Sequence, residues 1–141
     1  MKIALLGDTH FGARGDSQAF HKYFFKFYDE IFFPYLEKHN IKEVIQLGDL
    51  MDRRKFINDV TLSTMKDKFV KKFKGDLNLN VLIGNHDIYY RHSNKICSLV
   101  ELFGDLTQDF NINIIEDNTT LEFDGRKIDM IPWINKENHN N

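Results

Sequence analysis

Three short apolar runs along the chain each end at a glycine that is followed by polar residues. The runs cover residues 3–6, 44–47 and 81–83. A short apolar run bounded by glycine is typical of a buried β-strand, because a helix needs a longer periodic pattern. We therefore predict strands over residues 1–7, 43–47 and 79–83.

The segments between these runs have the spacing of amphipathic helices. Phe20, Phe24 and Phe27 recur every three to four residues, which places them on one helical face. We predict a helix over residues 17–39, and Pro34 should kink or end it because proline lacks a backbone N–H. Two further helices are predicted over residues 60–74 and 93–103.

The last part of the chain changes to a period of two. Residues 112–116, 119–123 and 127–131 alternate apolar and polar side chains, with Asp124-Gly125 between the last two. Asp-Gly between alternating runs predicts a β-hairpin with a tight turn. Strands joined by helices and followed by mainly β structure predict a layered α/β fold.

Composition and charge narrow the class of protein. The chain has 141 residues, 42% of them hydrophobic, which is enough for one domain with a core and argues against disorder. The formal net charge of -2 excludes nucleic-acid binding by a global basic field, so such binding must use local patches or metal ions. The single cysteine, Cys97, excludes an internal disulfide. No run is long enough to span a membrane and none resembles a signal peptide, so we expect a cytoplasmic protein.

Ligand-type side chains follow each predicted strand. Asp8 and His10 follow the first strand, Asp49 the second, and Asn85 and His86 the third. Since the carboxyl ends of parallel strands meet at one edge of a sheet, these side chains should converge there. On an extended chain, Asp8 and His10 would also point to the same side. Oxygen and imidazole ligands gathered in this way predict a hydrolytic site for divalent metal ions.

His86 has a different expected role from the four metal ligands. As the neighbour of Asn85, it should point in a different direction, toward the leaving oxygen of a bound phosphate. A histidine there can act as a general acid or stabilise the transition state. Each motif alone is more often a turn or a helix cap, but three motifs at strand ends in this order favour the metal site.

The same residues resemble the motifs of a known family. Asp8-Thr9-His10, Gly48-Asp49-Leu50-Met51-Asp52 and Gly84-Asn85-His86-Asp87 look like the first three motifs of the calcineurin-like metallophosphoesterases. Within that superfamily the chain resembles the SbcD-type DNA nucleases (the meiotic recombination eleven family), and especially their branch in T4-like phages. The finer resemblance rests on residues 52–55, 84–90 and 123–133.

The resemblance implies a two-metal nuclease. Asp8, His10 and Asp49 would hold one ion, Asp49 and Asn85 would hold the other, and His86 would be the catalytic histidine. The ions would be Mn²⁺, with Mg²⁺ as the alternative. The implied activity is exonuclease and endonuclease cleavage of DNA in double-strand-break processing and recombination.

The resemblance also implies an architecture and partners. The fold would be α/β, with a metallophosphoesterase-type β-sandwich flanked by helices. Residues 1–134 would form the N-terminal part of the phosphoesterase (nuclease) domain, and residues 135–141 a polar tail. An SbcC-type coiled-coil ABC ATPase would be the protein partner, and the chain would form a homodimer through helices at 60–74 and 93–103.

The chain departs from the family pattern after the third motif. In the family, a lone histidine and a Gly-His-X-His motif complete both metal shells, and this sequence has neither of them. His139 lies in a polar tail with no strand before it and is not assigned that role. The capping domain and the ATPase-binding tail of the family are also absent. Since only four of the expected ligands are present in this sequence, we expect weak metal affinity.

Residues around the motifs receive supporting roles. Asp52 would support the metal-binding loop and histidine without touching the ions, and Asp87 would do the same or cap the following segment. Basic residues after the second motif could contact DNA phosphates or form an exposed basic turn. Tyrosines after the third motif could stack on a nucleotide or pack over the sheet edge. These residues are Arg53, Arg54, Lys55, Tyr89 and Tyr90. His21, in the first predicted helix, is interpreted as an ordinary, partly exposed residue.

Two alternative functions compete with the nuclease. One is another phosphoesterase of the superfamily, such as a nucleotide phosphodiesterase or a protein phosphatase, whose second motif is G-D-X-V-D-R-G. Met51 and Arg54 replace the valine and the final glycine of that motif, and Asp87 replaces a glutamate in the third, so the nuclease is favoured. The other alternative is a non-catalytic dimerisation module, because the metal shell is incomplete.

Overall fold

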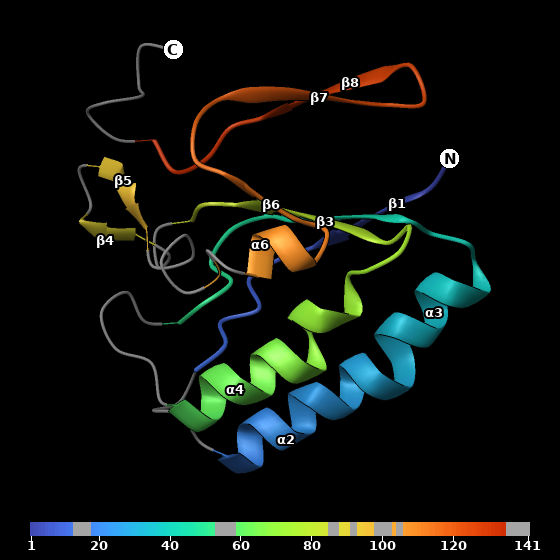
Figure 1. Ribbon diagram of the computed structural model, residues 1–141, viewed down its shortest axis with the longest axis vertical. Coiled ribbons are helices and arrows are strands. Elements are labelled where there is room, and N and C mark those ends of the chain that lie inside the picture. The colour runs from blue at the N-terminus through green and yellow to red at the C-terminus, as the bar shows by residue number, and fades with distance from the viewer. Residues whose placement is uncertain are drawn as a thin grey trace.

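A four-stranded parallel sheet with the strand order β1-β2-β3-β6 forms the centre of the molecule (Figure 1). This computed structural model describes residues 1–12, 18–52, 59–84, 88–90, 93–97, 103 and 106–134. The strands are β1 (Ile3–Leu6), β2 (Glu43–Gln46), β3 (Asn78–Leu82) and β6 (Ile112–Ile115). The three strands predicted from the apolar runs therefore lie side by side and in chain order.

The fourth strand, β6, pairs parallel to β3, although its alternating sequence resembles that of an antiparallel strand. Ile112 and Ile115 are buried while Asn113 between them is exposed. The alternation arises because β6 lies at the edge of the sheet, where cover is incomplete. A short helix that the sequence pattern does not predict, α6 (Leu106–Asp109), precedes this strand.

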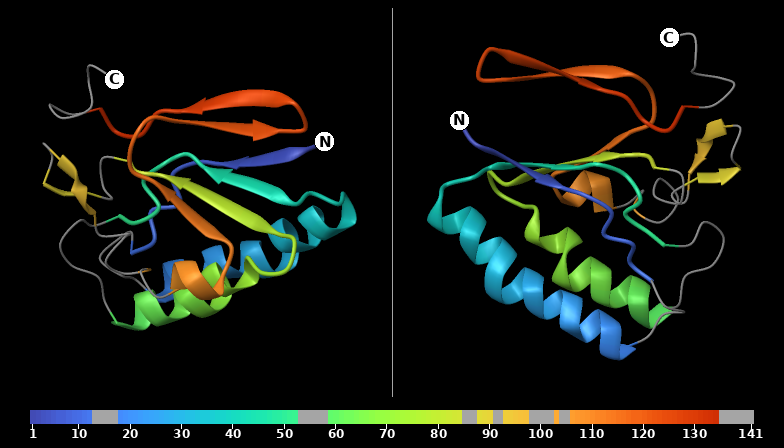
Figure 2. Two further views of the ribbon diagram at one scale, coloured as in Figure 1. Left: turned by 45° about the horizontal axis from the view of Figure 1, so that its top comes forward. Right: turned by 180° about the vertical axis from the view of Figure 1, so that it is seen from behind.

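Helices cover one face of the sheet (Figures 1 and 2). The first predicted helix is observed as three consecutive segments, α2 (Gln18–Phe27), η1 (Tyr28–Phe32) and α3 (Phe33–Lys38). The second is observed as α4 (Asp59–Lys68), followed by the 3₁₀ turn η2 (Val70–Lys72). No helix among the described residues is long and apolar enough to span a membrane.

The predicted irregularity at Pro34 takes the form of a π-helical turn just before the proline. The backbone N–H of Phe33 donates to the carbonyl of Tyr28, five residues earlier, within η1. Pro34 then lies in the first turn of α3, where its missing N–H leaves no acceptor without a partner. The helix therefore continues past the proline to residue 38.

Aromatic side chains fill the layer between the helices and the sheet. Phe11, in the loop after β1, stacks on Phe25 of α2 with ring centroids 5.5 Å apart and planes 7° from parallel. Its ring also lies 5.9 Å from that of Tyr28 and 5.3 Å from that of Phe69. All four residues are at most 5% exposed. The loop that follows β1 is thus anchored in the aromatic core.

The predicted hairpin lies on the opposite face of the sheet (Figure 2). It consists of β7 (Thr119–Phe123) and β8 (Arg126–Met130). Asp124 and Gly125 join the strands with φ angles of 53° and 78°, as a type I′ turn requires. Met130 packs with Ile45 and Ile115 in a second, smaller core. The fold is therefore the predicted layered α/β architecture, with helices, a parallel sheet and a β-hairpin stacked in that order.

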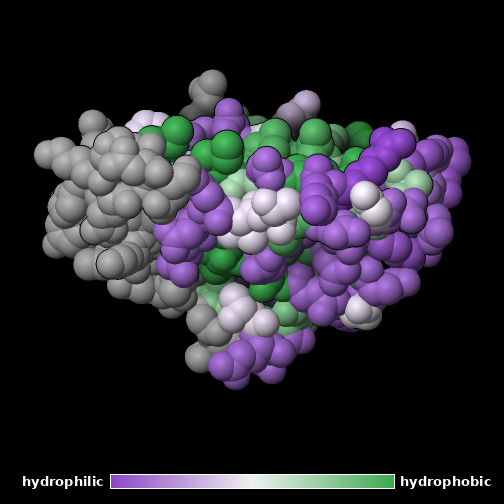
Figure 3. Space-filling view, turned by 90° about the horizontal axis from the view of Figure 1, so that it is seen from above, coloured by the Kyte–Doolittle hydropathy of each residue, from purple (hydrophilic) through white to green (hydrophobic). Residues whose placement is uncertain are grey.

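The hairpin leaves part of this sheet face uncovered. Leu5 and Leu47 lie on the same face as Ile3 and Ile45, two residues earlier on their strands, but are 65% and 49% exposed. Seen from above, apolar patches reach the surface in the middle part of this side of the molecule, between hydrophilic ones (Figure 3). The uncovered part lies toward the carboxyl ends of β1 and β2.

The prediction of a helix over residues 93–103 is wrong in its first part. Ser93–Cys97 form strand β5, which pairs antiparallel with β4 (Ile88–Tyr90). The pairing joins Ile88 to Cys97 and Tyr90 to Ser93. A strand depends on its partner strand, and the spacing of apolar residues within one segment does not reveal that partner.

Candidate metal centre

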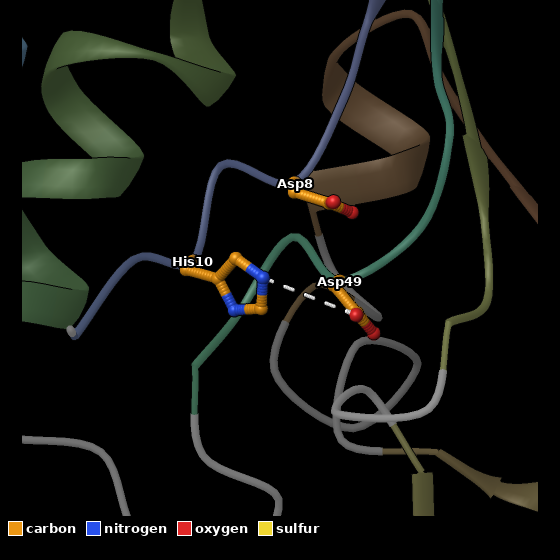
Figure 4. Close-up of side chains that lie close together, drawn as sticks. All are labelled: Asp8, His10 and Asp49. Carbon is orange, nitrogen blue, oxygen red and sulfur yellow. Dashed lines mark ion pairs between the residues drawn. The ribbon is translucent and has the colours of Figure 1, made fainter.

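Two of the three strand-end motifs form one cluster of ligand-type side chains at the carboxyl edge of the sheet. Asp8 and His10 come from the loop after β1, and Asp49 comes from the loop after β2. One side-chain nitrogen or oxygen from each of the three residues lies within 4.8 Å of the others. Figure 4 shows these three side chains close together, with His10 and Asp49 facing each other.

The two loops are joined to each other by backbone hydrogen bonds. The N–H of His10 donates to the carbonyl of Asp49 at 3.0 Å, and the N–H of Phe11 donates to the carbonyl of Leu50 at 2.8 Å. The N–H of Asp52 then donates to the carbonyl of Phe11 at 2.9 Å. The loops therefore extend the parallel pairing of β1 and β2 beyond the strands, which holds His10 and Asp49 in a common frame.

The backbone at all three clustered residues is left-handed. The φ angles are 36° at Asp8, 44° at His10 and 52° at Asp49. Such values are uncommon for residues with a Cβ and tend to mark functional sites, where the surrounding structure must compensate the strain. The expectation that Asp8 and His10 converge because they alternate along an extended chain is therefore incorrect. Left-handed turns after the strand bring them together.

Asp52 lies on the other side of the His10 ring from Asp49. The distance from His10 Nδ1 to Asp52 Oδ1 is 3.3 Å, and that from His10 Nε2 to Asp49 Oδ2 is 3.9 Å. A carboxylate at Nδ1 favours the tautomer that carries its proton there and leaves the Nε2 lone pair facing the cluster. Such an arrangement suits a histidine that binds a metal ion, and the supporting role of Asp52 stays a prediction.

The chemistry of the donor set fits a divalent cation. Two carboxylates and an imidazole suit Mn²⁺, Mg²⁺ or a related ion better than they suit a soft metal, which prefers thiolates. Asp8 is exposed, while His10 and Asp49 are half-buried. An ion held between these residues would keep coordination positions open toward solvent, as a catalytic site requires.

Two glycines let Asp49 approach the neighbouring strand. A Cβ on Gly84, just after β3, would collide with the backbone nitrogen and the carboxylate of Asp49. A Cβ on Gly48, where φ is 103°, would lie 3.0 Å from the Cα of Gly84. Glycine is therefore needed at both positions, and the start of the third motif lies directly against Asp49.

Several predicted site residues lie outside the described part of the chain. They are Arg53, Arg54, Lys55, Asn85, His86 and Asp87. Tyr89 and Tyr90 belong to β4, for which only the backbone is described. The predicted roles of these residues stay predictions.

The interpretation of His21 as a partly exposed residue is wrong. Its side chain is 4% exposed, and its Nε2 accepts a hydrogen bond from the backbone N–H of Gly12 at 3.0 Å. Nδ1 lies 3.5 Å from the hydroxyl of Thr61 on α4. His21 precedes the buried Phe25 by four residues, and that spacing on the core face could have indicated its burial. It connects the loop after His10 to both helices.

An open groove begins beside Asp8. It has a volume of about 510 Å³ and runs between the loop after β1 and the exposed aromatic side of α2. Asp8 and Thr9 line one wall, and Tyr23, Phe27 and Ile31 line the other. Asp8 is therefore accessible to molecules that occupy the groove.

Comparisons with known proteins agree with this geometry. Residues 1–141 match the calcineurin-like phosphoesterase family. The chain is 31% identical to exonuclease subunit 1 of Enterobacteria phage T4, over 98% of this chain and 40% of the phage protein. It is also similar to the crystal structure of Pseudomonas putida nuclease MPE, with a TM-score of 0.55 and 23% identity over 85% of this chain and 50% of that one.

These similarities differ in what they establish. The likeness to the Pseudomonas nuclease concerns the fold, because the sequence identity is low. The chain spans 40% of the length of its phage relative. The family match covers every residue and includes the Asp8, His10 and Asp49 cluster. This chain therefore belongs to the calcineurin-like phosphoesterases, a family of metal-dependent phosphoesterases.

Proposed function

We propose that the chain is the N-terminal part of the phosphoesterase domain of a DNA nuclease, a subunit with exonuclease and endonuclease activity in double-strand-break processing and recombination. The observation that carries this proposal is the cluster of Asp8, His10 and Asp49, with Asp52 3.3 Å from Nδ1 of His10. Family membership and the similarity to a phage exonuclease subunit support a nucleic-acid substrate.

The proposed site has two metal positions. Asp8, His10 and Asp49 would hold one ion, and Asp49 would share its carboxylate with a second ion held also by Asn85. Mn²⁺ is the proposed ion, with Mg²⁺ as the alternative. Bound divalent ions would neutralise the phosphodiester charge and activate water for attack on phosphorus.

The protein groups have separate tasks in this proposal. Asp52, whose carboxylate lies 3.3 Å from Nδ1 of His10, would favour a proton on Nδ1 and so keep Nε2 available as a ligand. The left-handed loops hold Asp8 and Asp49 in place before any ion binds, so little reorganisation accompanies binding. His86, in its imidazolium form, would donate a proton to the leaving sugar oxygen. Asp87 would support the third motif.

DNA contacts are proposed on both sides of the site. Arg53, Arg54 and Lys55 follow the second motif and would neutralise backbone phosphates. Tyr89 and Tyr90, on β4, would stack on nucleotides near the scissile bond. With a net charge of -2, DNA binding must depend on such local contacts and on the metal ions.

The proposed assembly contains a coiled-coil ABC ATPase of the SbcC type and a second copy of this chain. The homodimer would form through the helical region around 60–74, which contains α4. The region around 93–103 would contribute with a strand at 93–97 in place of the predicted helix. The complex would act in the cytoplasm of a bacterial or phage-infected cell.

Cleavage assays with Mn²⁺ test the proposal. Labelled linear duplex DNA and a phosphopeptide would be offered to the same preparation, with and without a chelator. Cleavage of DNA that the chelator abolishes is expected, and turnover of the phosphopeptide alone would favour the protein-phosphatase alternative. Asp8→Asn should remove the activity. Asp76→Asn, in an exposed pair with Lys42, is the matched control and should retain it.

Titration with Mn²⁺ separates the nuclease from the dimerisation module. Heat of binding that Asp8→Asn removes and Asp76→Asn preserves would support a functional metal site. A protein that binds no Mn²⁺ and cleaves no DNA would contradict the nuclease and favour the non-catalytic alternative.

A further inference from the structure

Gln46, the last residue of β2, is a polar side chain buried next to the apolar Val44 and Ile45. It is fully buried, with 0% exposure, and its amide makes two hydrogen bonds to the same residue. The backbone N–H of Gly48 donates to Oε1 at 2.8 Å, and Nε2 donates to the carbonyl of Gly48 at 2.7 Å. The side chain thus holds both polar groups of the residue that precedes Asp49.

These bonds occur where the regular sheet ends. Gln46 is the last paired residue of β2, opposite Leu6 on one side and Val81 on the other. Gly48, with a φ of 103°, turns the chain out of the strand while it is still buried. A buried peptide group needs hydrogen-bond partners. The side-chain amide of Gln46 carries a donor and an acceptor, as a peptide group does. It therefore makes the two hydrogen bonds to Gly48 that the backbone of a neighbouring strand would otherwise make.

The loop is fixed from the other side as well. Gly48 and Asp49 both pack directly against Gly84, where a Cβ would not fit. Asp49 is therefore held on one side by the hydrogen bonds between Gln46 and Gly48 and on the other by its contact with Gly84. Its φ of 52° is uncommon for aspartate, so its position depends on this surrounding support.

We infer that Gln46 is a positioning residue for Asp49, through the Gly48 peptide, and so raises the affinity of the site for divalent metal. The inference rests on the proposed function, because it assumes that Asp49 is a metal ligand. Gln46 itself does not touch the ion. Outer residues of this kind typically change metal affinity by about 10–100-fold.

Gln46→Met is the informative variant, because methionine has a similar length and no amide. We expect it to weaken Mn²⁺ binding by about tenfold or more in calorimetric titration of the full chain. Asn80→Leu is the matched control. Asn80 is a buried amide on β3, and it accepts a hydrogen bond from Asn113 at 3.0 Å, away from Gly48. The Asn80→Leu variant should lower thermal stability as Gln46→Met does, but its affinity for Mn²⁺ should change by less than threefold.

Hydrogen exchange on the wild-type protein gives a second measurement that does not depend on a folded variant. The Gly48 amide should exchange as slowly as the amides of β2, because Gln46 accepts its hydrogen bond. Fast exchange at Gly48, or unchanged Mn²⁺ affinity in Gln46→Met, would overturn the inference while leaving the nuclease proposal intact. Absence of Mn²⁺ binding in the wild-type protein would instead overturn the proposed function and the inference together.

Discussion

Asp49 is held by contacts to both His10 and Gly84. Its carbonyl accepts a hydrogen bond from the N–H of His10, its carboxylate lies 3.9 Å from Nε2 of the same residue, and its backbone packs against Gly84. Each contact limits the directions in which the carboxylate can point. A ligand that is held in place before binding loses little conformational entropy when the ion arrives.

At the residue scale, Asp49 and His86 should separate metal binding from catalysis. Asp49→Ala removes the proposed bridging carboxylate, so Mn²⁺ affinity should fall by about 100-fold or more and cleavage should be lost. His86→Ser should keep the affinity within about threefold while lowering the cleavage rate by about 10²–10⁴-fold, the usual contribution of a general acid. Calorimetry and a DNA cleavage assay on both variants measure this difference. Normal cleavage by His86→Ser would exclude the proposed role of that histidine.

At the scale of elements, the π-helical turn η1 places Tyr28 in the aromatic core. The tyrosine is 3% exposed and its ring lies 5.2 Å from that of Phe69. Burial raises the pKa of Tyr28 from 10.0 to about 12, because the phenolate would lose its hydration. The alkaline stability of the helical layer should therefore depend on this residue.

The direction of that dependence follows from proton binding. Between pH 10 and pH 12 the unfolded chain releases the Tyr28 proton while the folded chain keeps it, so the free energy of unfolding falls as the pH rises. This contribution to stability is complete below pH 10. From pH 9 to pH 11 the wild-type protein should lose about 1 kcal/mol more than Tyr28→Phe. Urea unfolding at both pH values tests this, and equal losses in the two proteins would contradict it.

At the scale of the whole molecule, the helices leave two surfaces that could meet another chain. On α4, Val60 is 54% exposed, while Asp67 and Lys68 on the same helix form exposed ion pairs. On the neighbouring helix, Ile31 is 58% exposed beside the groove that begins at Asp8. The proposed homodimer uses the first of these surfaces.

Two charge substitutions distinguish the surfaces. If the dimer forms through α4, Val60→Lys should raise its dissociation constant by about tenfold or more, because a charge would replace a buried apolar contact. Ile31→Lys should have little effect and serves as the control. Sedimentation velocity over a range of concentrations gives both constants. Dissociation by Ile31→Lys alone would assign the interface to the other helix.

The sequence predicted the main strands, the helices over residues 17–39 and 60–74 and the β7–β8 hairpin, because their patterns are local. Apolar runs ending in glycine identified β1, β2 and β3, and Asp124-Gly125 identified the turn. It did not predict β5, because that strand exists through its pairing with β4. It also did not predict the burial of His21, whose partners Gly12 and Thr61 belong to other elements.

The sequence by itself determined that Asp8, His10 and Asp49 follow β-strands, since short-range apolar spacing and glycine set where those strands end. Only the tertiary structure decided how these side chains converge. Their left-handed backbone, the contact between Asp49 and Gly84 and the clamp from Gln46 arise where strands distant in sequence become neighbours. Hydrogen bonds and close packing between such segments select conformations that local preference alone disfavours, and the candidate metal centre depends on those conformations.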